Sequence, residues 1–133
     1  MSMAREAGIS GRVFKTSWFS KAARKAQIAD IQLCSAIRQV VAGLADDLGG
    51  GVYKKRLGKG LYRSIIVAKG GRNWVYAYLF AKQDRANIRD DELLEFRALA
   101  DLYARKTDAD IEKELRLKEL LEICHGPESQ IQE

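Results

Sequence analysis

Three extended segments in close succession constrain the fold most. Val52 to Leu57, Leu61 to Lys69 and Arg72 to Lys82 are rich in β-branched, aromatic and aliphatic residues, and only Gly58-Lys59-Gly60 and Gly70-Gly71 separate them. Such short connections join antiparallel strands, and a double glycine suits a two-residue hairpin turn because the centre of that turn requires positive φ. The sequence therefore predicts an antiparallel meander. Its last strand is apolar on both faces, so it should lie in the middle of the sheet with helices covering at least one side.

Helical patterns precede the meander. We expect a first strand over Arg12 to Phe19, a helical stretch over Ser20 to Gln27, and a longer helix that Asp30 caps and that the DDLGGG run of residues 46–51 ends. The apolar face of the longer helix repeats at spacings of three and four residues and consists of Ile31, Cys34, Ile37, Val40, Val41 and Leu44.

Two further helices are predicted after the meander. The first is capped by Asp90 or Asp91, and its partial apolar stripe consists of Leu94, Leu99, Leu102 and Tyr103. Thr107 and Asp110 match a capping box for the second, which we expect to run to about Ile123. The element order is thus β-α-α-β-β-β-α with an extra C-terminal helix. An antiparallel sheet packed on helices makes this an α+β fold.

The length and composition fit one folded domain. A chain of 133 residues with 47% apolar residues and one proline can bury a core of its own. We expect residues 1–10 to be a flexible extension, residues 11–105 to form the domain proper, and residues 106–133 to add an acidic helix and tail. The longest apolar run, Trp74 to Ala81, is too short to cross a bilayer, and the N-terminus has no apolar signal core. We therefore expect a cytoplasmic protein without a membrane partner.

Residue types that often carry catalysis or bind metals are scarce. Cys34 and Cys124 lie far apart in helix-like patterns without CxxC spacing or a paired histidine, so neither a zinc site nor a disulfide framework is indicated, and we interpret both as core residues. His125 is the only histidine and follows the last predicted helix, which argues against histidine acid–base chemistry. The glycine-rich turns lack the GxxxxGK(S/T) spacing of a phosphate-binding loop.

Charge is divided unevenly along the chain. Residues 1–89 contain 17 Lys and Arg against 5 Asp and Glu, whereas residues 90–133 contain 6 against 13, which gives net charges of +12 and −7. A basic body suggests an anionic partner, and the acidic end suggests a solvated or partner-binding segment. Charge alone leaves a solvated basic surface as an equal alternative, because Lys and Arg also cover ordinary soluble proteins.

Several Lys and Arg side chains lie close together on the predicted sheet. Strand alternation places Lys54 and Arg56 on one face and Lys55 on the other, and the short connection through Lys59 brings Arg63 beside the first pair. Like charges held this close are unfavourable unless an anion binds them, and crowding lowers the pKa of a lysine, which makes its neutral amine available as a base. The spacing is equally compatible with an edge strand that is charged to prevent aggregation.

The chain's most specific motifs lie in two segments, VYKKRLGKGLYRSIIV (Val52 to Val67) and VYAYLFAKQDRANI (Val75 to Ile88). Together with RVFKTSWFSKAARK near the start, they resemble the RelE-like toxins of the RelE/ParE superfamily, in its HigB-type branch. The similarity covers roughly residues 11–105. It implies a small α+β fold with a twisted antiparallel sheet and an endoribonuclease that cuts mRNA in the ribosomal A site. It also implies an antitoxin encoded alongside, which we expect to be a helix-turn-helix DNA-binding protein.

The resemblance also assigns residues to the ribonuclease motifs, namely Lys54, Arg56 and Leu57 on one strand, Tyr62-Arg63 on the next, and Lys82 to Arg85 in the loop after the last. The catalytic tyrosine that some members carry beyond this loop has no equivalent, because Ile88-Arg89 occupies that position. The branch of the superfamily that poisons gyrase generally lacks the ribonuclease cluster, so the cluster in this chain favours RNA cleavage.

The mechanism expected on this basis is transesterification without a metal or other cofactor, in which the ribose 2′-hydroxyl attacks its own phosphate and leaves a 2′,3′-cyclic phosphate and a 5′-hydroxyl. We expect Lys54 to act as general base, Arg56 and Arg63 to neutralise the phosphorane, and Lys82 or Arg85 to support the departing oxygen. Arginine keeps its charge at physiological pH, so electrostatic stabilisation is the role expected of Arg85. Further RNA contacts are expected from Lys55, Lys59 and Arg89.

Two other classes of function stay open on the sequence alone. A gyrase-poisoning toxin would be a protein-binding inhibitor without chemistry of its own, and its basic strand would be dispensable. A nucleic-acid-binding module without catalysis could stack bases on Trp74, Tyr76 and Tyr78, but aromatic residues at alternate positions of a central strand more often form one packed core face.

The predicted C-terminal helix has enough apolar residues to form a packing surface. They are Ile111, Leu115, Leu117, Leu120 and Leu121. It could fold against its own domain, or it could offer a surface to the antitoxin or to a second copy. We favour packing within the domain, because an apolar stripe left free would invite aggregation.

Overall fold

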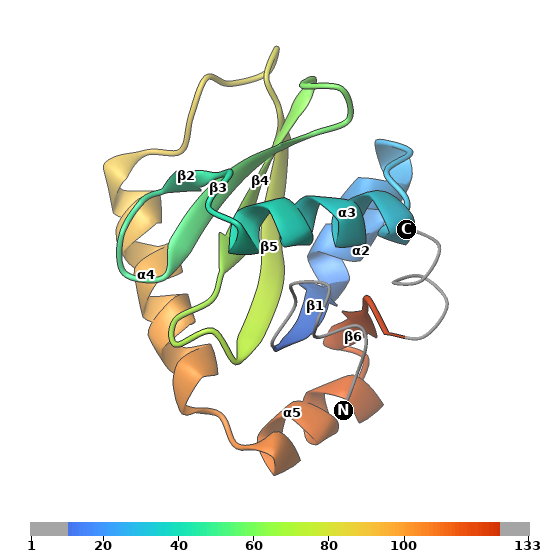
Figure 1. The fold of residues 1–133 in the computed structure, drawn as a ribbon, viewed down its shortest axis with the longest axis vertical. Coiled ribbons are helices and arrows are strands. Elements are labelled where there is room, and N and C mark those ends of the chain that lie inside the picture. Colours follow the sequence, from blue (N-terminus) through green and yellow to red (C-terminus); the bar gives the residue numbers. More distant parts are fainter. Residues whose placement is uncertain (1–10, 126–133) are drawn as a thin grey trace.

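The computed structural model describes residues 11–125, which form an α+β fold, as the sequence predicts (Figure 1). Its strands are β1 (Arg12–Thr16), β2 (Asp46–Asp47), β3 (Val52–Leu57), β4 (Tyr62–Val67), β5 (Asn73–Ala81) and β6 (Leu120–Ile123). Its helices are α2 (Ser17–Lys25), α3 (Asp30–Val41), α4 (Asp90–Arg105) and α5 (Asp108–Arg116). The predicted N-terminal extension, residues 1–10, lies outside the described residues. Between residues 11 and 125, no helix is long and apolar enough to cross a membrane.

The strands form one six-stranded sheet in the order β2-β3-β4-β5-β1-β6. β3, β4 and β5 are the predicted antiparallel meander, and β5 lies in the interior of the sheet, as expected. Gly70 and Gly71 have φ values of 83° and 75°, which supply the positive φ predicted for the turn after β4. The sheet as a whole is mixed, because β1 runs parallel to β5 and β6 pairs antiparallel with β1. The sequence pattern did not reveal the short strands β2 and β6.

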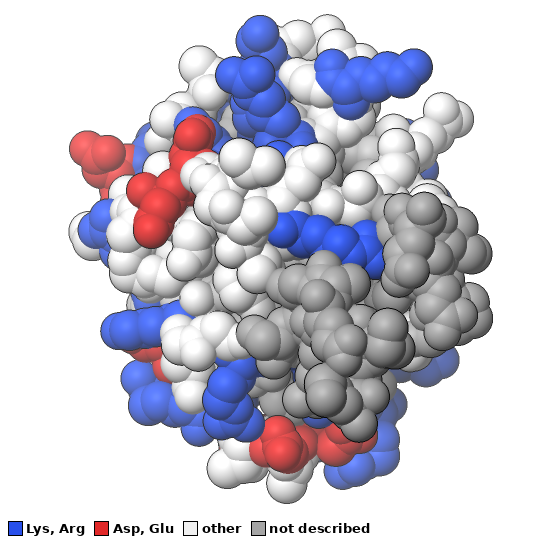
Figure 2. Space-filling model, in the orientation of Figure 1, with Lys and Arg blue, Asp and Glu red and all other residues white. Residues whose placement is uncertain are grey.

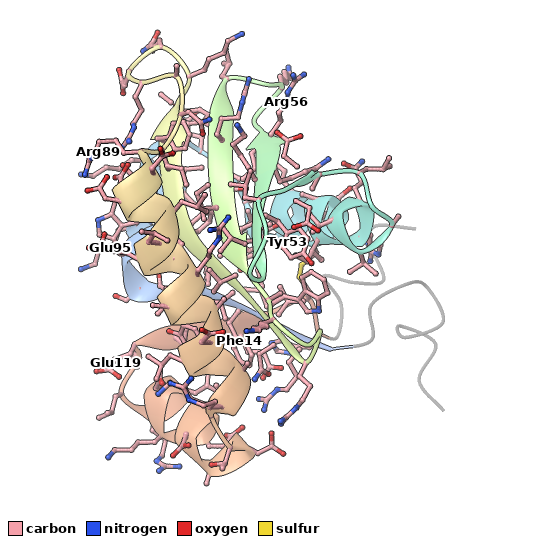
Figure 3. The ribbon with its side chains drawn as sticks, turned by 90° about the vertical axis from the view of Figure 1, so that its left-hand side faces the viewer. Phe14, Tyr53, Arg56, Arg89, Glu95 and Glu119 are labelled. Atoms are coloured by element: carbon pink, nitrogen blue, oxygen red, sulfur yellow. A yellow bond between two sulfur atoms is a disulfide. The ribbon has the colours of Figure 1, made fainter. Side chains whose placement is uncertain are left out.

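Helices cover both faces of the sheet. α2 and α3 pack on one face, here called the α3 face, whose core contains Phe19 and Tyr76. α4 and α5 pack on the other, the α4 face, whose core contains Phe14 and Ile111. Figure 3 shows the sheet between these layers, with Tyr53 on the side of α3 and Phe14 on the side of α4 and α5. The central strand is thus buried on both sides, as its composition predicts.

A β-bulge turns one aromatic residue of β5 to the other face. The register shifts between Ile65 and Ile66, so that Tyr78 pairs with Ile65 and Tyr76 pairs with Ile66. Trp74 and Tyr76 therefore belong to the core of the α3 face, whereas Tyr78 packs against the core of the α4 face. The expectation that the three aromatic residues share one face was wrong for Tyr78, because the bulge interrupts the alternation of side chains.

β1 ends, and α2 and α3 begin, differently from the prediction. β1 ends at Thr16, three residues before the predicted end at Phe19, because the Thr16 hydroxyl accepts a hydrogen bond from the Phe19 amide at 3.0 Å and caps α2. Asp30 is the first residue of α3 and not its cap, and its carboxylate instead accepts a hydrogen bond from Lys15 at 2.7 Å. The early cap at Thr16 brings Trp18 into the first turn of a helix.

Cys34 and Cys124 form a disulfide, with Cα atoms 5.3 Å apart and a sequence separation of 90. This corrects the expectation of two unpaired core cysteines. Cys34 is fully buried in α3, as predicted, but Cys124 follows β6 and not a helix. The pairing of β6 with β1 returns the chain to the neighbourhood of α3, and this long-range contact cannot be read from the spacing of two cysteines.

The C-terminal segment contains a shorter helix than predicted. Thr107 and Asp110 form the predicted capping box, with hydrogen bonds of 3.1 and 2.9 Å between side chains and amides. The helix was expected to reach Ile123 but ends at Arg116, because Lys118 adopts a positive φ of 61° and the chain then enters β6.

The C-terminal segment packs within the domain, which confirms that part of the prediction. Ile111, Leu120 and Ile123 are at most 2% exposed, and β6 extends the sheet beside β1. Leu117 and Leu121, two other apolar residues of the predicted stripe, are 58% and 36% exposed. Which apolar residues of this segment are buried therefore depends on the observed end of α5 and start of β6, and not on the single helix that was predicted.

Candidate functional site

The antiparallel pair β3–β4 brings three predicted cations together. Arg56 and Arg63 are direct partners in the strand register, and Lys54 lies opposite Ile65. Val52 and Ile65 belong to the core of the α4 face, so strand alternation places Lys54, Arg56 and Arg63 on that face too. Figure 3 shows Arg56 at the end of β3, at the same end of the molecule as the start of α4. Lys54, Arg56 and Arg63 are called the cation cluster below.

Lys54 is held between two neighbours. Its Nζ donates to Oδ1 of Asn87 at 3.3 Å and lies 3.8 Å from Oδ2 of Asp46. The Lys54 side chain is 17% exposed, whereas Asp46 is 69% exposed, so the ion pair is at the rim of the site. These contacts fix the amine, and an exposed carboxylate such as Asp46 can swing away when a competing anion binds.

The two arginines of the cluster have charges that no carboxylate of residues 11–125 neutralises. The partly buried Arg63 guanidinium donates to the carbonyl oxygens of Gly60 and Tyr62 at 2.9 and 3.1 Å. Arg56 is exposed and forms no ion pair with any described residue. Carbonyl groups orient a guanidinium without cancelling its charge, and like charges on directly opposed residues repel one another. An anion bound at this pair would relieve the repulsion.

Lys55 lies on the α3 face, as strand alternation predicts. Its Nζ donates to the carbonyl of Leu44 at 3.0 Å. Partial burial, together with the neighbouring charge of Arg56, lowers the pKa of Lys55. The fold therefore separates Lys55 from the cation cluster.

Arg85 is fixed in the loop between β5 and α4. Its guanidinium forms a two-bond ion pair with Glu92 in the first turn of α4 and also donates to the hydroxyl of Tyr78 at 3.2 Å. Its Nε donates to the carbonyl of Asn87 at 3.0 Å, and its Cζ lies 5.5 Å from the ring centroid of Phe80. These contacts tie the loop to β5 and to α4, and the same loop presents the Asn87 side chain to Lys54.

The Arg85–Glu92 pair perturbs both groups. The hydrogen bonds with Glu92 raise the pKa of Arg85, and the hydrogen bonds from Arg85 and from the backbone amide of Arg89 lower the pKa of Glu92 to about 2. Glu92 is therefore ionised at neutral pH. Its charge opposes that of Arg85, so the loop cation contributes less to the local positive potential than Arg56 or Arg63 does.

The remaining predicted cations lie around the cluster. Lys59 is exposed in the β3–β4 turn, and Lys82 is exposed at the start of the β5–α4 loop. The backbone amide of Lys82 donates to the carbonyl of Leu61 at 2.9 Å, which keeps the turn and the loop adjacent. Arg89 directly precedes α4 and pairs with Asp91 at 3.0 Å. Lys59 and Lys82 thus border the site, whereas Arg89 is engaged with the start of α4.

Ion pairs join the basic part of the chain to the acidic part. The pairs that join the two parts across the fold are Arg12 with Glu112 and Glu122, Lys69 with Asp101, Arg72 with Asp108, and Arg85 with Glu92. Among residues 11–125, no ion pair involves Arg56, Lys59, Arg63 or Lys82. Figure 2 shows Lys and Arg at the upper end of the molecule, over the β3–β4 turn and the β5–α4 loop, and further Lys and Arg over its lower half. The four cations at and around the site therefore keep their charge without an ion pair to any residue from 11 to 125.

Sequence reasoning missed several residues that contact the predicted cations, among them Asp46, Tyr78, Asn87 and Glu92. Asn87 lies inside the AKxDRxNI motif, so its presence there was the one available signal. Asp46 was interpreted only as part of a helix-ending run, and Tyr78 as a core residue or, in the alternative that was not favoured, as a base-stacking residue. Their roles depend on β2 and on the bulge, neither of which has a local sequence pattern.

The histidine lies away from the cation cluster. His125 is exposed, with Nε2 3.2 Å from the carbonyl oxygen of Glu122 in β6, at the far edge of the sheet from β3. In the described part of the chain, no group of three or more His, Cys, Asp and Glu side chains is placed to hold a metal ion.

The sequence profile of the family described as the RelE toxin of the RelE / RelB toxin-antitoxin system matches residues 11–123. The match extends past residue 105, where the resemblance quoted above ended, and includes α5 and β6. No individual curated protein matches the chain significantly. Because the matched region spans most of the chain, including the entire cation cluster, the protein belongs to the RelE toxin family of toxin–antitoxin systems.

Proposed function

We propose that this toxin is an endoribonuclease that cleaves mRNA in the ribosomal A site and thereby stops translation and growth. The observation that supports this most is the cation cluster, in which Arg56 and Arg63 face one another on adjacent strands without a neutralising carboxylate among residues 11–125. A phosphodiester that gains negative charge during reaction is the ligand such a site stabilises best.

The proposed reaction is a transesterification. Lys54 accepts the proton of the ribose 2′-hydroxyl, the 2′-oxygen forms a bond to the adjacent phosphorus, and the bond from phosphorus to the 5′-oxygen breaks. The products are a 2′,3′-cyclic phosphate and a 5′-hydroxyl, whose proton comes from water or from the protonated Lys54. Arg56 and Arg63 stabilise the phosphorane, which carries one more negative charge than the starting diester.

Lys82 is the stronger candidate for supporting the departing 5′-oxygen. It is exposed at the start of the loop that borders the cluster, whereas the charge of Arg85 is opposed by Glu92. Arg85 then acts as a positioning residue, since it orders the loop that brings Asn87 to Lys54. Lys59 contacts the RNA backbone nearby, and the weaker candidates for RNA contacts are Lys55 and Arg89, which have partners elsewhere.

The proposed partners are mRNA on the ribosome and a cognate antitoxin. The family description, which names a toxin–antitoxin system, supports the antitoxin. The antitoxin is proposed to be a helix-turn-helix DNA-binding protein, and the site of action is proposed to be the cytoplasm.

Brief induction in a bacterium tests the function. Growth and translation should stop within minutes, and mapping of mRNA ends should show new 5′-hydroxyl ends inside translated codons. Induction of the Arg56→Ala/Arg63→Ala variant serves as the control and should leave transcripts whole. Growth arrest with intact mRNA and broken DNA would reject the proposal and indicate a gyrase-poisoning toxin.

A further inference from the structure

A cleft next to the cation cluster contains an exposed tryptophan that the proposed mechanism does not use. The cleft has a volume of about 570 Å³ and is lined by α2, by the last part of β5 and by the loop that follows β5. Trp18 forms one wall, and 51% of its surface is exposed. Its ring stacks on Tyr78, with centroids 5.1 Å apart and an interplanar angle of 27°.

The cleft exists because β1 is shorter than β5. β1 pairs with β5 only as far as Tyr76, since Thr16 ends the strand and caps α2. Among the described residues, no strand pairs with the last part of β5 on that side, and α2 lies there instead. The bulge described above turns Tyr78 so that the Trp18 ring can stack on it.

A continuous set of aromatic rings connects this cleft to the cation cluster. The Tyr78 ring lies between Trp18 and Phe80, with the Phe80 centroid 5.8 Å away. Phe80 is the direct strand partner of Arg63. The Arg85 guanidinium lies over the rings of both Tyr78 and Phe80, at 5.9 and 5.5 Å. A chain that extends from the cluster along this path therefore reaches Trp18 next.

Two lysines lie on the same face of α2 as Trp18. Lys21 and Lys25 follow it by three and seven residues, so all three side chains share one helix face, and both lysines are exposed and line the cleft. Neither forms an ion pair with a described residue. The two lysines are separated by about 6 Å along the helix axis, which is comparable with the distance between neighbouring phosphates of an extended single strand.

We propose that this cleft binds one unpaired nucleotide of the RNA substrate next to the scissile phosphate, with the base stacked on Trp18 and two neighbouring backbone phosphates bound by Lys21 and Lys25. The proposal rests on the proposed ribonuclease function and adds a subsite to it. Stacking on an aromatic side chain accepts any base, because every base has a π face. The exposed Trp18 surface supplies that platform, and the lysine rim supplies the complementary charge. An acidic segment of the antitoxin is the alternative occupant that the test must exclude.

Fluorescence of Trp18 reads out the proposed contact directly. The chain has two tryptophans, and Trp74 is only 8% exposed, so a ligand that stacks in the cleft acts mainly on Trp18. We would titrate the full chain as the Arg63→Ala variant, in which cleavage is suppressed, with a single-stranded hexaadenylate. Saturable quenching is expected, and it should disappear in the same chain with Trp18→Phe.

Binding measured by a second method separates stacking from charge. Trp18→Ala should weaken hexaadenylate binding by about 5- to 150-fold, the loss expected for one stacked base. Lys21→Gln with Lys25→Gln should weaken binding and make it less dependent on salt, because two phosphate contacts are lost. Arg24→Gln is the matched control, since Arg24 is an exposed cation of α2 that does not line the cleft. Thermal unfolding checks each variant, and Trp18→Leu, which also removes the aromatic ring, replaces Trp18→Ala if the latter does not fold.

Cleavage of ribosome-bound mRNA distinguishes failure of this proposal from failure of the proposed function. If the parent does not cut RNA but hexaadenylate quenches Trp18, the ribonuclease function is wrong and the nucleotide site stands. If the parent cuts RNA, hexaadenylate leaves Trp18 fluorescence unchanged and Trp18→Ala cuts at the parental rate, the nucleotide site is wrong. Quenching by the purified antitoxin but not by hexaadenylate would also overturn it and assign the cleft to the protein partner.

Discussion

Replacement of Ile111 by alanine should destabilise the whole domain, although this residue lies in the C-terminal segment. Ile111 is 0% exposed and belongs to the core of the α4 face. Removing a fully buried isoleucine side chain down to alanine typically costs about 2–5 kcal/mol. A domain of this size is stable by about 5–15 kcal/mol in total, so the variant should lose a large fraction of its free energy of unfolding. Urea unfolding measures the loss, and the midpoint should fall by about 1–2.5 M at a slope of about 2 kcal/mol per M.

Leu117→Ala is the matched control, because Leu117 lies directly after α5 but is 58% exposed. Its effect should stay within about 0.5 kcal/mol. The native Ile111→Ala protein should still cleave RNA at the parental rate at low temperature, since the cation cluster is on β3 and β4. Equal unfolding midpoints for the two variants would refute the packing of α5 on this core.

Three other predictions concern the same architecture. Truncation after Lys106 should leave a chain that does not fold, because it removes the buried side chains of Ile111, Leu120 and Ile123. Full burial of each such side chain contributes about 1.5–3 kcal/mol to stability. Circular dichroism would show the loss of structure, and a folded, active fragment would contradict the prediction. A reductant should lower the stability of the parent by about 4–5 kcal/mol, since the Cys34–Cys124 disulfide closes a loop between residues 90 positions apart in the sequence. The reductant should not change the stability of Cys124→Ala. Equal sensitivity of both proteins to the reductant would show that the disulfide does not form. The pKa of Glu92 is lowered from 4.5 to about 2, so the stabilisation that its charge gives is complete above pH 4.5 and is lost as pH falls towards 2. The difference in free energy of unfolding between the parent and Glu92→Gln should therefore shrink from pH 4.5 to pH 2. A difference that does not change with pH would contradict the ion pair.

The parts of the fold that depend on local pattern were predictable. The three strands of the meander, the glycines with positive φ and the capping box at Thr107 each follow from residues that are adjacent in sequence. The parts that were wrong depend on contacts between distant segments. The last part of the predicted C-terminal helix is instead the strand β6, because it pairs with the edge of β1. This pairing places Cys124, which follows β6, next to Cys34, so that the disulfide can form.

The candidate site divides in the same way. The positions of Lys54, Arg56 and Arg63 follow from strand alternation and from one short turn, so the sequence was sufficient to group them. The ion pair between Arg85 and Glu92 joins a loop to a helix, and no sequence spacing indicated it. The bulge in β5 turns Tyr78 towards Trp18 and Arg85, and only the register of β4 against β5 reveals it.

Cleavage by the Arg63→Ala variant tests the central proposal most directly. Ribosomes programmed with a defined mRNA would be incubated with the purified parent, with Arg63→Ala and with Arg72→Ala, an exposed arginine that pairs with Asp108 away from the cluster. The rate for Arg63→Ala should be about 100- to 1,000-fold below that of the parent, because one charged contact to the phosphorane is lost. Arg72→Ala should cut at the parental rate, and all three proteins should unfold at similar temperatures. A parental cleavage rate for Arg63→Ala, or a loss of activity that only accompanies unfolding, would contradict the assignment of the active site to this cluster.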